Sequence, residues 1–217
     1  VGFHAGANPM NPQMPAALAQ NDITWVADDA SAQPNQRSIP WPGGGTTLTV
    51  PRHPSNIYYN VATRTDQLDE YNWIYVTPAG GGNCTPVPGV TTCRDTPASW
   101  DDYTKSEANI MFGHLAGNDP RPHYMHQPNL MVDNAGQGIM YGADGEGVLD
   151  RLFADYNQYF DTSVAPITNP TMTEAGTTMR NQAAWTAGKN SVTAYIQNGK
   201  VTIQTSGSLA VPITGTT

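Results

Sequence analysis

The sequence predicts an α/β fold with a small β-hairpin appended at its C-terminal end. Apolar residues recur at helical spacing in several segments, and these segments alternate with short runs of β-branched and aromatic residues that favour strands. Near the C-terminus, two β-branched runs flank Asn198-Gly199, the preferred dipeptide of a type I′ turn. We therefore expect one main α/β domain over residues 1–188 and a hairpin appendage over residues 189–217.

The N-terminal part of the chain is expected to contain a helix, a strand and a long loop. Residues 15–20 favour a short helix, and residues 23–27 are β-branched and aromatic enough to favour a strand. Asp28 and Asp29 follow, at the kind of strand end where α/β proteins place their chemistry, although a solvated turn explains Asp29 at least as well. Residues 30–56, rich in Pro, Gly and Gln, are predicted to form a long loop.

The middle of the chain is predicted to form a strand over residues 57–61 and then a helix from about Thr65. Ser99 and Asp102 have the spacing of a capping box, which predicts a second helix that runs toward His114. These elements would supply the scaffold of the main domain.

Two further helices and the hairpin follow. A helix that begins near Asp144 carries an apolar stripe at spacings of three and four residues, and a capping box formed by Thr171 and Glu174 predicts another helix. The two-residue turn of the hairpin also fixes its strand register. The expected pairs are Ile196 with Val201 and Ala194 with Ile203.

Composition excludes some partners and favours others. The net charge of −8 argues against nucleic acid and anionic membranes as partners, whereas neutral and amino-sugar ligands remain compatible. No apolar run is long enough to span a membrane. Only 13 % of the residues are charged, which is typical of secreted proteins. The two cysteines, Cys84 and Cys93, bracket a Pro-, Gly- and Thr-rich loop and are predicted to form a disulfide, because a zinc site would need two more ligands.

Residues 118–130 (NDPRPHYMHQPNL) carry the most suggestive chemistry. Three prolines oppose a regular helix and favour a rigid, extended segment, in which His123 and His126 would point to opposite sides unless the chain bends. One histidine could face a pocket, or one could be half-buried and the other exposed. Arg121, between two prolines, suits the orientation of a carboxylate, although it could equally form a structural pair with Asp119 or Asp133.

The other three histidines have non-catalytic explanations as well as functional ones. His4 lies near the start of the chain, His53 lies in a proline-bracketed loop, and His114 ends a predicted helix, where the helix dipole favours an imidazolium. No serine or cysteine nucleophile motif is present. A glycosidase that uses Asp28 with Asp133 or Asp119 is a further possibility.

Four strings of the sequence together resemble the later part of secreted polysaccharide deacetylases. They are residues 23–31 (ITWVADDAS), 48–61 (LTVPRHPSNIYYNV), 69–75 (DEYNWIY) and 118–130. The resemblance is to the NodB-like carbohydrate esterase family, of the type that includes the fungal galactosaminogalactan deacetylase, and it covers about residues 1–200.

This resemblance implies the C-terminal portion of a distorted (β/α) barrel that removes N-acetyl groups from amino-sugar polymers. It also implies a divalent metal, zinc being the expected ion, a catalytic aspartate and a histidine acid. Family members hold the metal with an aspartate and an HxxxH pair in early motifs that this sequence lacks. The main ligands are therefore expected upstream of Val1, with His4 as a possible ligand, unless the site departs from the family pattern.

The family's last motif, Leu-x-His, is matched by Tyr124-Met125-His126 with tyrosine in place of leucine, which implies that His126 is the general acid and His123 the alternative. Asp28 is the third expected catalytic residue. The residues expected to contact substrate are Trp25, His53, Arg121 and Tyr124. We thus expect the C-terminal part of an extracellular, metal-dependent polysaccharide N-deacetylase. A non-catalytic carbohydrate-binding or cell-surface module is the alternative, because abundant tyrosines and tryptophans suit sugar stacking in either case.

Overall fold

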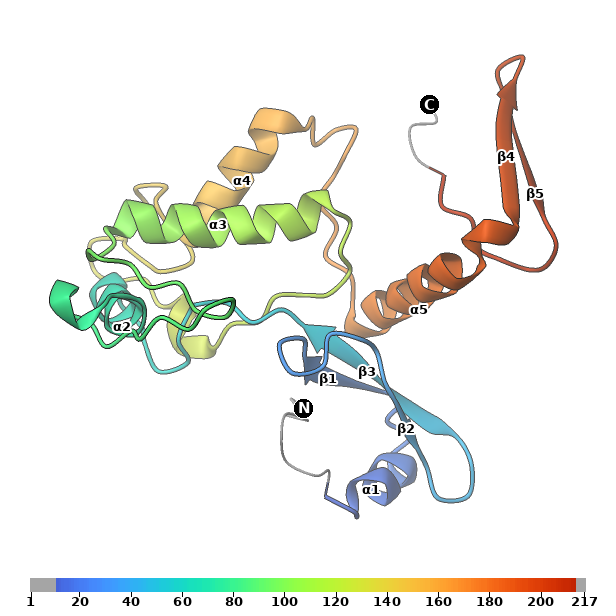
Figure 1. Ribbon diagram of the computed structural model, residues 1–217, viewed down its shortest axis with the longest axis horizontal. Helices are drawn as coiled ribbons and strands as arrows, with labels where there is room; N and C mark the ends of the chain where they lie inside the picture. Colours follow the sequence, from blue (N-terminus) through green and yellow to red (C-terminus); the bar gives the residue numbers. More distant parts are fainter. Residues whose placement is uncertain (1–10, 214–217) are drawn as a thin grey trace. The chain divides into compact units, whose positions relative to one another are not determined.

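The computed structural model describes residues 11–213, which form a mixed α/β fold divided into two compact units (Figure 1). Within that range, unit 1 comprises residues 11–52, 120–122 and 169–213, and unit 2 comprises residues 53–119 and 123–168. The predicted α/β class is confirmed. The strands form one three-stranded and one two-stranded sheet, and residues 11–213 contain no closed barrel. The predicted domain boundary at residue 188 stays a prediction.

The three-stranded sheet of unit 1 has the order β1-β3-β2, with β1 parallel and β2 antiparallel to the central β3. The strands are β1 (Trp25–Asp29), β2 (Ser38–Pro40) and β3 (Thr46–Arg52). The prediction of one long loop over residues 30–56 is therefore wrong. The sequence of β3 has β-branched residues, but flanking glycines and Pro51 hide the signal, and pairing on both sides stabilises it.

Helices α1 (Met14–Gln20) and α5 (Met172–Gly188) contact this sheet. A small apolar core forms around Leu18, Val26 and Ile39. Helix α5 approaches β1 closely at Gly176, where a Cβ atom would collide with the ring of Trp25. The predicted capping box at Thr171 and Glu174 is confirmed at the start of α5.

The predicted C-terminal hairpin is confirmed, including its register. A short 3₁₀ turn (Lys189–Ser191) leads into β4 (Val192–Gln197), which pairs antiparallel with β5 (Lys200–Thr205). Asn198 and Gly199 have φ of 52° and 73°, the left-handed values that a type I′ turn requires. The observed pairs include Ile196 with Val201 and Ala194 with Ile203.

Unit 2 is built from three helices around one apolar core. They are α2 (Arg64–Tyr75), α3 (Trp100–Ala116) and α4 (Val148–Tyr159), and two short 3₁₀ helices, Pro78–Gly80 and Gln127–Leu130, lie in its connections. Tyr103 is fully buried in the core and packs edge-on against Tyr71. The predicted capping box of Ser99 and Asp102 is confirmed. Helix α4 begins at Val148, slightly later than predicted, after an extended Gly147.

Residues 57–61 form an irregular, turn-containing segment, so the strand predicted there is wrong. Side chains, instead of a neighbouring strand, bind its backbone groups. The N–H of Tyr58 donates to Oε1 of Gln67, and Nδ2 of Asn129 donates to the carbonyl oxygens of Tyr58 and Val61. The β-branched side chains here serve the core of unit 2, because Ile57 and Val61 are both buried in it.

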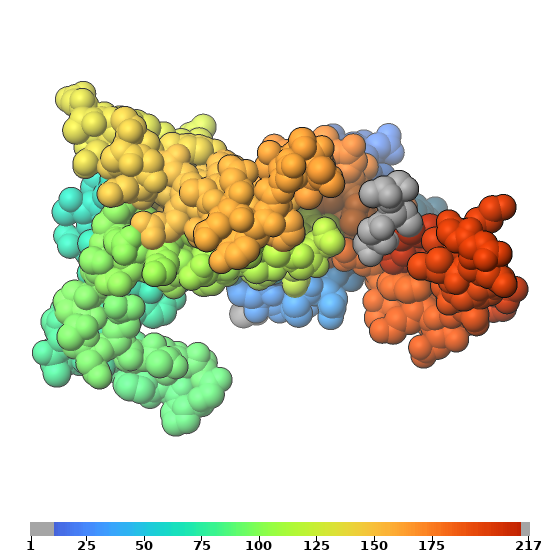
Figure 2. All heavy atoms as spheres, turned by 90° about the horizontal axis from the view of Figure 1, so that it is seen from above, coloured from blue at the N-terminus to red at the C-terminus, as the bar shows by residue number. Residues whose placement is uncertain are grey.

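Cys84 and Cys93 form the predicted disulfide, with 5.7 Å between their Cα atoms. The bond closes a loop whose residues 85–90 are all exposed. Figure 2 shows this part of the chain, in green, projecting from the surface of its unit. The bond therefore constrains a segment that buries little apolar surface of its own.

Candidate metal centre

Two histidines and an aspartate lie together in unit 2. His53 directly follows β3, His114 lies in the last turn of α3, and Asp119 follows the end of that helix. One potential ligand atom from each of these residues lies within 4.8 Å of the others. The group could therefore hold a metal ion.

The end of α3 explains why His114 and Asp119 are neighbours. Asn118 has φ of 53°, a left-handed conformation that terminates the helix and reverses the chain. The N–H of Asn118 donates to the carbonyl oxygen of Leu115, and the N–H of Asp119 donates to that of His114 at 3.0 Å. Asp119 is thus folded back onto the last helical turn, beside the histidine.

His53 joins this pair through two contacts. Its ring stacks on the ring of His114, with 3.7 Å between the ring centroids and 10° between the planes. Its Nε2 lies 2.9 Å from Oδ2 of Asp119, which accepts the hydrogen bond from the imidazole. The His53 side chain is 11 % exposed and that of Asp119 is 16 % exposed, so both are shielded but not sealed from solvent.

His123 completes a histidine trio. Its backbone bridges to that of His53, and its Nε2 lies 3.0 Å from Nδ1 of His114. Within residues 11–213, Nδ1 of His123 is buried without a hydrogen-bond partner. Burial, reinforced by the charges of His53 and His114, lowers the pKa of His123 to about 4. His123 is therefore a neutral imidazole at neutral pH.

A neutral His123 can determine the tautomer of His114. If Nε2 of His123 accepts the hydrogen bond, then Nδ1 of His114 is the protonated nitrogen. Nε2 of His114 then keeps the lone pair that a metal ligand needs. Histidine ligands in proteins commonly donate their second ring N–H to a neighbouring acceptor in this way.

The donor set fits a first-row divalent cation. Two imidazoles and one carboxylate are ligands that suit zinc and similar ions, and three protein ligands leave a position for water or substrate. The carboxylate supplies one negative charge against the ion's two positive ones. The group thus offers ligands of the kinds that such ions prefer.

Two of the residues predicted for the site belong to unit 1 and have structural partners there. Asp28 is fully buried and pairs with Arg37, with 2.6 Å between Oδ2 and the guanidinium nitrogen. Trp25 packs against Gly176 of α5. These contacts explain both residues without catalysis, and their predicted catalytic and substrate-binding roles stay predictions.

The remaining predicted residues of the loop are divided between the units. Arg121 belongs to unit 1, where it donates to the carbonyl oxygen of Pro34. His126 belongs to unit 2 and lies edge-on to Tyr59 and Tyr124, with ring centroids 6.0 Å and 6.1 Å away. It is not among the clustered ligands, so its predicted role as a general acid also stays a prediction.

Sequence reasoning singled out His53 and His123 but missed what surrounds them. It explained His114 by helix capping and Asp119 only as a possible partner for Arg121 or a second carboxylate. The signal that could have joined them is Gly117-Asn118, a helix-stop dipeptide that predicts a chain reversal between the two side chains. His4, the possible ligand near the N-terminus, lies outside the described residues.

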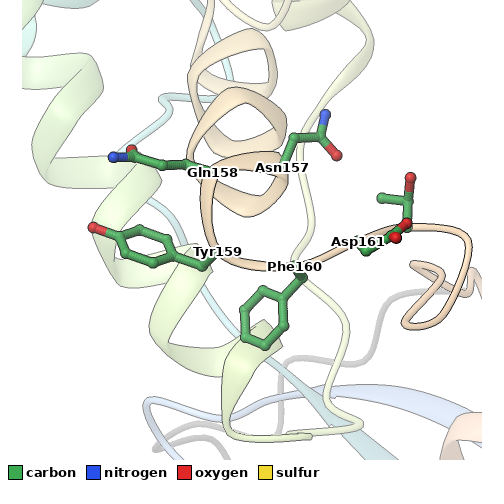
Figure 3. A pocket seen from close by; sticks show the side chains of 6 residues that line it. Asn157, Gln158, Tyr159, Phe160 and Asp161 are labelled. Atoms are coloured by element: carbon green, nitrogen blue, oxygen red, sulfur yellow. The ribbon is translucent and has the colours of Figure 1, made fainter.

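A shallow pocket of about 560 Å³ lies at the end of α4 (Figure 3). Six consecutive residues line it: Asn157, Gln158, Tyr159, Phe160, Asp161 and Thr162. The ring of Phe160 stacks on Tyr156, and the carboxylate of Asp161 accepts hydrogen bonds from the backbone N–H and hydroxyl of Ser163. These contacts engage the ring of Phe160 and the carboxylate of Asp161, whereas Tyr159 is 68 % exposed.

No protein-family profile, curated protein sequence or solved structure matches this chain. Among residues 11–213, no helix has the length and apolar character needed to cross a membrane.

Proposed function

We propose that this chain is part of an extracellular, metal-dependent polysaccharide N-deacetylase, with a divalent ion held by His53, His114 and Asp119. The observation that carries the proposal is the mutual proximity of these three ligand groups, all within 4.8 Å. The same ligand types, one aspartate and two histidines, hold the metal in the family that the sequence resembles. Their spacing along this chain differs from the HxxxH pattern, so the ligand set would be a departure from that family.

Zinc is the proposed ion, because imidazole and carboxylate ligands with an open position are typical of hydrolytic zinc sites. When bound, such an ion polarises a carbonyl and lowers the pKa of a coordinated water. Amide hydrolysis of an N-acetyl group needs both effects.

The protein side chains have distinct roles in this proposal. Three residues, His53, His114 and Asp119, bind the ion. His123 orients His114 through the hydrogen bond between Nε2 of His123 and Nδ1 of His114. His126 supplies the proton to the leaving amine, as the resemblance implies. The exposed ring of Tyr59, which lies edge-on to His126, suits contact with a sugar face.

Two general features support an extracellular polymer substrate. The disulfide suits an oxidising environment, and the acidic composition suits cationic amino sugars, the products of deacetylation, better than polyanions.

Metal content is the decisive test. We expect the purified chain, dialysed against zinc and then against metal-free buffer, to retain zinc in stoichiometric amount by elemental analysis. His114→Ala and Asp119→Ala should lose it, whereas the histidine control His126→Ala should keep it. Acetate release from an N-acetylated amino-sugar oligomer is then expected to need both zinc and His126.

Three outcomes would contradict the proposal. Wild-type protein that retains no zinc would reject the metal site. Zinc retention that is equal in His114→Ala would place the ion elsewhere. Binding of the oligomer without metal uptake or acetate release would support a carbohydrate-binding module instead.

A further inference from the structure

We propose that Glu107, acting through Asn56, is a positioning residue that holds His53 in the histidine cluster. The inference deepens the proposed metal site and rests on it for its functional meaning. The geometry on which it stands, however, is a property of the chain itself.

Every polar atom of Asn56 is hydrogen-bonded within unit 2. Its backbone N–H and its Nδ2 donate to the two carboxylate oxygens of Glu107, at 3.1 Å and 2.5 Å. Its carbonyl oxygen accepts from Nε2 of Gln67 and from the hydroxyl of Tyr103, and its Oδ1 accepts from the hydroxyl of Tyr75 at 2.6 Å. Asn56 is thus fixed in position and in orientation.

The network lies in the interior of unit 2. Glu107 is 1 % exposed, and Gln67 and Tyr103 are 0 % exposed. A carboxylate in such surroundings is unfavourable unless it is hydrogen-bonded, and burial accordingly raises the pKa of Glu107 while the bonds from Asn56 oppose that rise. A buried polar network of this kind specifies one arrangement, because each member has few alternative partners.

Helix α3 contacts the segment of residues 53–56 at both ends of that segment. Glu107 and His114 are seven positions apart, or about two turns, so they lie on one face about 10.5 Å apart along the helix. His53 and Asn56 are three positions apart in the sequence, a step that spans about 10 Å in extended backbone. Glu107 binds Asn56 while His114 stacks on His53, so the segment is attached to one helix face at two matched points.

The intervening residues transmit the constraint. Pro54 has a fixed φ, which removes one degree of freedom between His53 and Asn56. Ser55 donates through its hydroxyl to the carbonyl oxygen of Tyr124, in the segment that also carries His123. Displacement of Asn56 is therefore expected to move the ring of His53.

A polarity swap tests this role. Asn56→Asp places a second carboxylate against Glu107, and the two should repel each other and displace the segment. The double variant Asn56→Asp with Glu107→Gln restores one donor facing one acceptor, with the polarity reversed. Asp144→Asn is the matched control, because it breaks an ion pair of the same unit, with Arg64, at another place.

The first readout is the set of His53 ring resonances in metal-free protein, measured by NMR. We expect them to shift in Asn56→Asp, to return in the double variant, and to stay unchanged in Asp144→Asn. The second readout is zinc affinity measured against a competing chelator. It should fall about 10–100-fold in Asn56→Asp and recover in the double variant, as is typical for groups that orient metal ligands.

If Asn56→Asp does not fold, Tyr75→Phe replaces it, since it removes one hydrogen bond to Asn56 and keeps the ring. It should move the same His53 resonances by a smaller amount. Unchanged His53 resonances in a folded variant, or a double variant that restores nothing, would overturn the positioning role. A third outcome separates the two proposals. If the variants shift and restore the His53 resonances as expected but the wild-type protein binds no zinc, the metal site is rejected and the positioning role is kept.

Discussion

Each compact unit buries one carboxylate within the described part of the chain, and the two are held differently. In unit 1, Asp28 is 0 % exposed and pairs with the guanidinium of Arg37. In unit 2, Glu107 is 1 % exposed and accepts hydrogen bonds from two N–H groups of Asn56. The first carboxylate is compensated by charge, and the second by neutral donors.

Both carboxylates are buried to the same extent, so burial alone does not distinguish their roles. The group that binds each carboxylate does. Asp28 looked catalytic in the sequence, yet its ion pair with Arg37 gives it a structural role in the sheet of unit 1. Glu107 lies within α3 and belongs to no motif of the sequence, yet it fixes the segment that carries His53. The neutral hydrogen-bond network around Asn56 holds that residue in one position. Among the described residues, it leaves the buried carboxyl of Glu107 without a cationic partner, and burial raises the pKa of that carboxyl.

The largest expected effect comes from breaking the charge pair of unit 1. Asp28→Ala leaves Arg37 without its carboxylate, and we expect the free energy of unfolding to fall by about 3–4 kcal/mol, in the lower part of the range for broken buried pairs because Arg37 is partly exposed. Urea unfolding measures the change. Asp28→Ala protein that keeps its stability but loses acetate release would return Asp28 to the catalytic residues.

The second effect concerns the covalent link of unit 2. Replacing Cys84 and Cys93 together by serine releases a short loop, which should lower the unfolding free energy by about 2–3 kcal/mol by the loop-entropy argument. Thermal melts of the double variant and of reduced wild type should agree. A melt that is unaffected by reduction would mean that the loop is already ordered by its other contacts.

A smaller effect tests the packing of α5 on the sheet of unit 1. Gly176→Ala gains helix propensity but places a methyl group against the ring of Trp25, and overpacking should win, with a net loss of about 1–2 kcal/mol. Gly113→Ala in α3 of unit 2 is the matched control, because nothing lies near its added Cβ. Gly113→Ala should leave the free energy of unfolding unchanged or slightly higher, as measured by urea unfolding. Equal changes in the two variants would contradict the close approach of Gly176 to Trp25.

The smallest effect is a pH dependence in unit 2. The hydrogen bonds and charge of Arg64 lower the pKa of Asp144 to about 2 from its ordinary value of 3.8. The ion pair therefore stabilises the folded state above about pH 4, and this contribution disappears as the pH falls toward 2. The difference in melting temperature between wild type and Asp144→Asn should vanish over that interval. A difference that persists below pH 2 would assign the effect to packing.

The elements that the sequence predicted well are those with local signals. The capping boxes at Ser99 and Thr171 and the Asn198-Gly199 turn each satisfy backbone groups within a few residues, so the chain alone specifies them. β3 was missed because its stability comes from β1 and β2, which flank it. Residues 57–61 were predicted as a strand because their composition is β-like, but distant side chains bind their backbone.

The candidate site was predicted only in fragments. His53 and His123 stood out because prolines surround them, which is a local feature. The cluster itself depends on α3, whose last turn brings His114 and Asp119 to His53 from far along the chain. Asn56 and Glu107 carry no motif at all, since their significance lies in a network that exists only in the folded unit.

The exposed loop between the two cysteines has a consequence for how the chain responds to proteases. Val90 is 83 % exposed, so the backbone beside it is open to cleavage. A cut there would divide the chain within the ring closed by Cys84 and Cys93, and the two pieces would remain covalently joined. The nicked protein should migrate as one species on a denaturing gel without reductant and as two species with it. In the folded, nicked protein the histidine cluster should stay assembled, because the cut lies outside it.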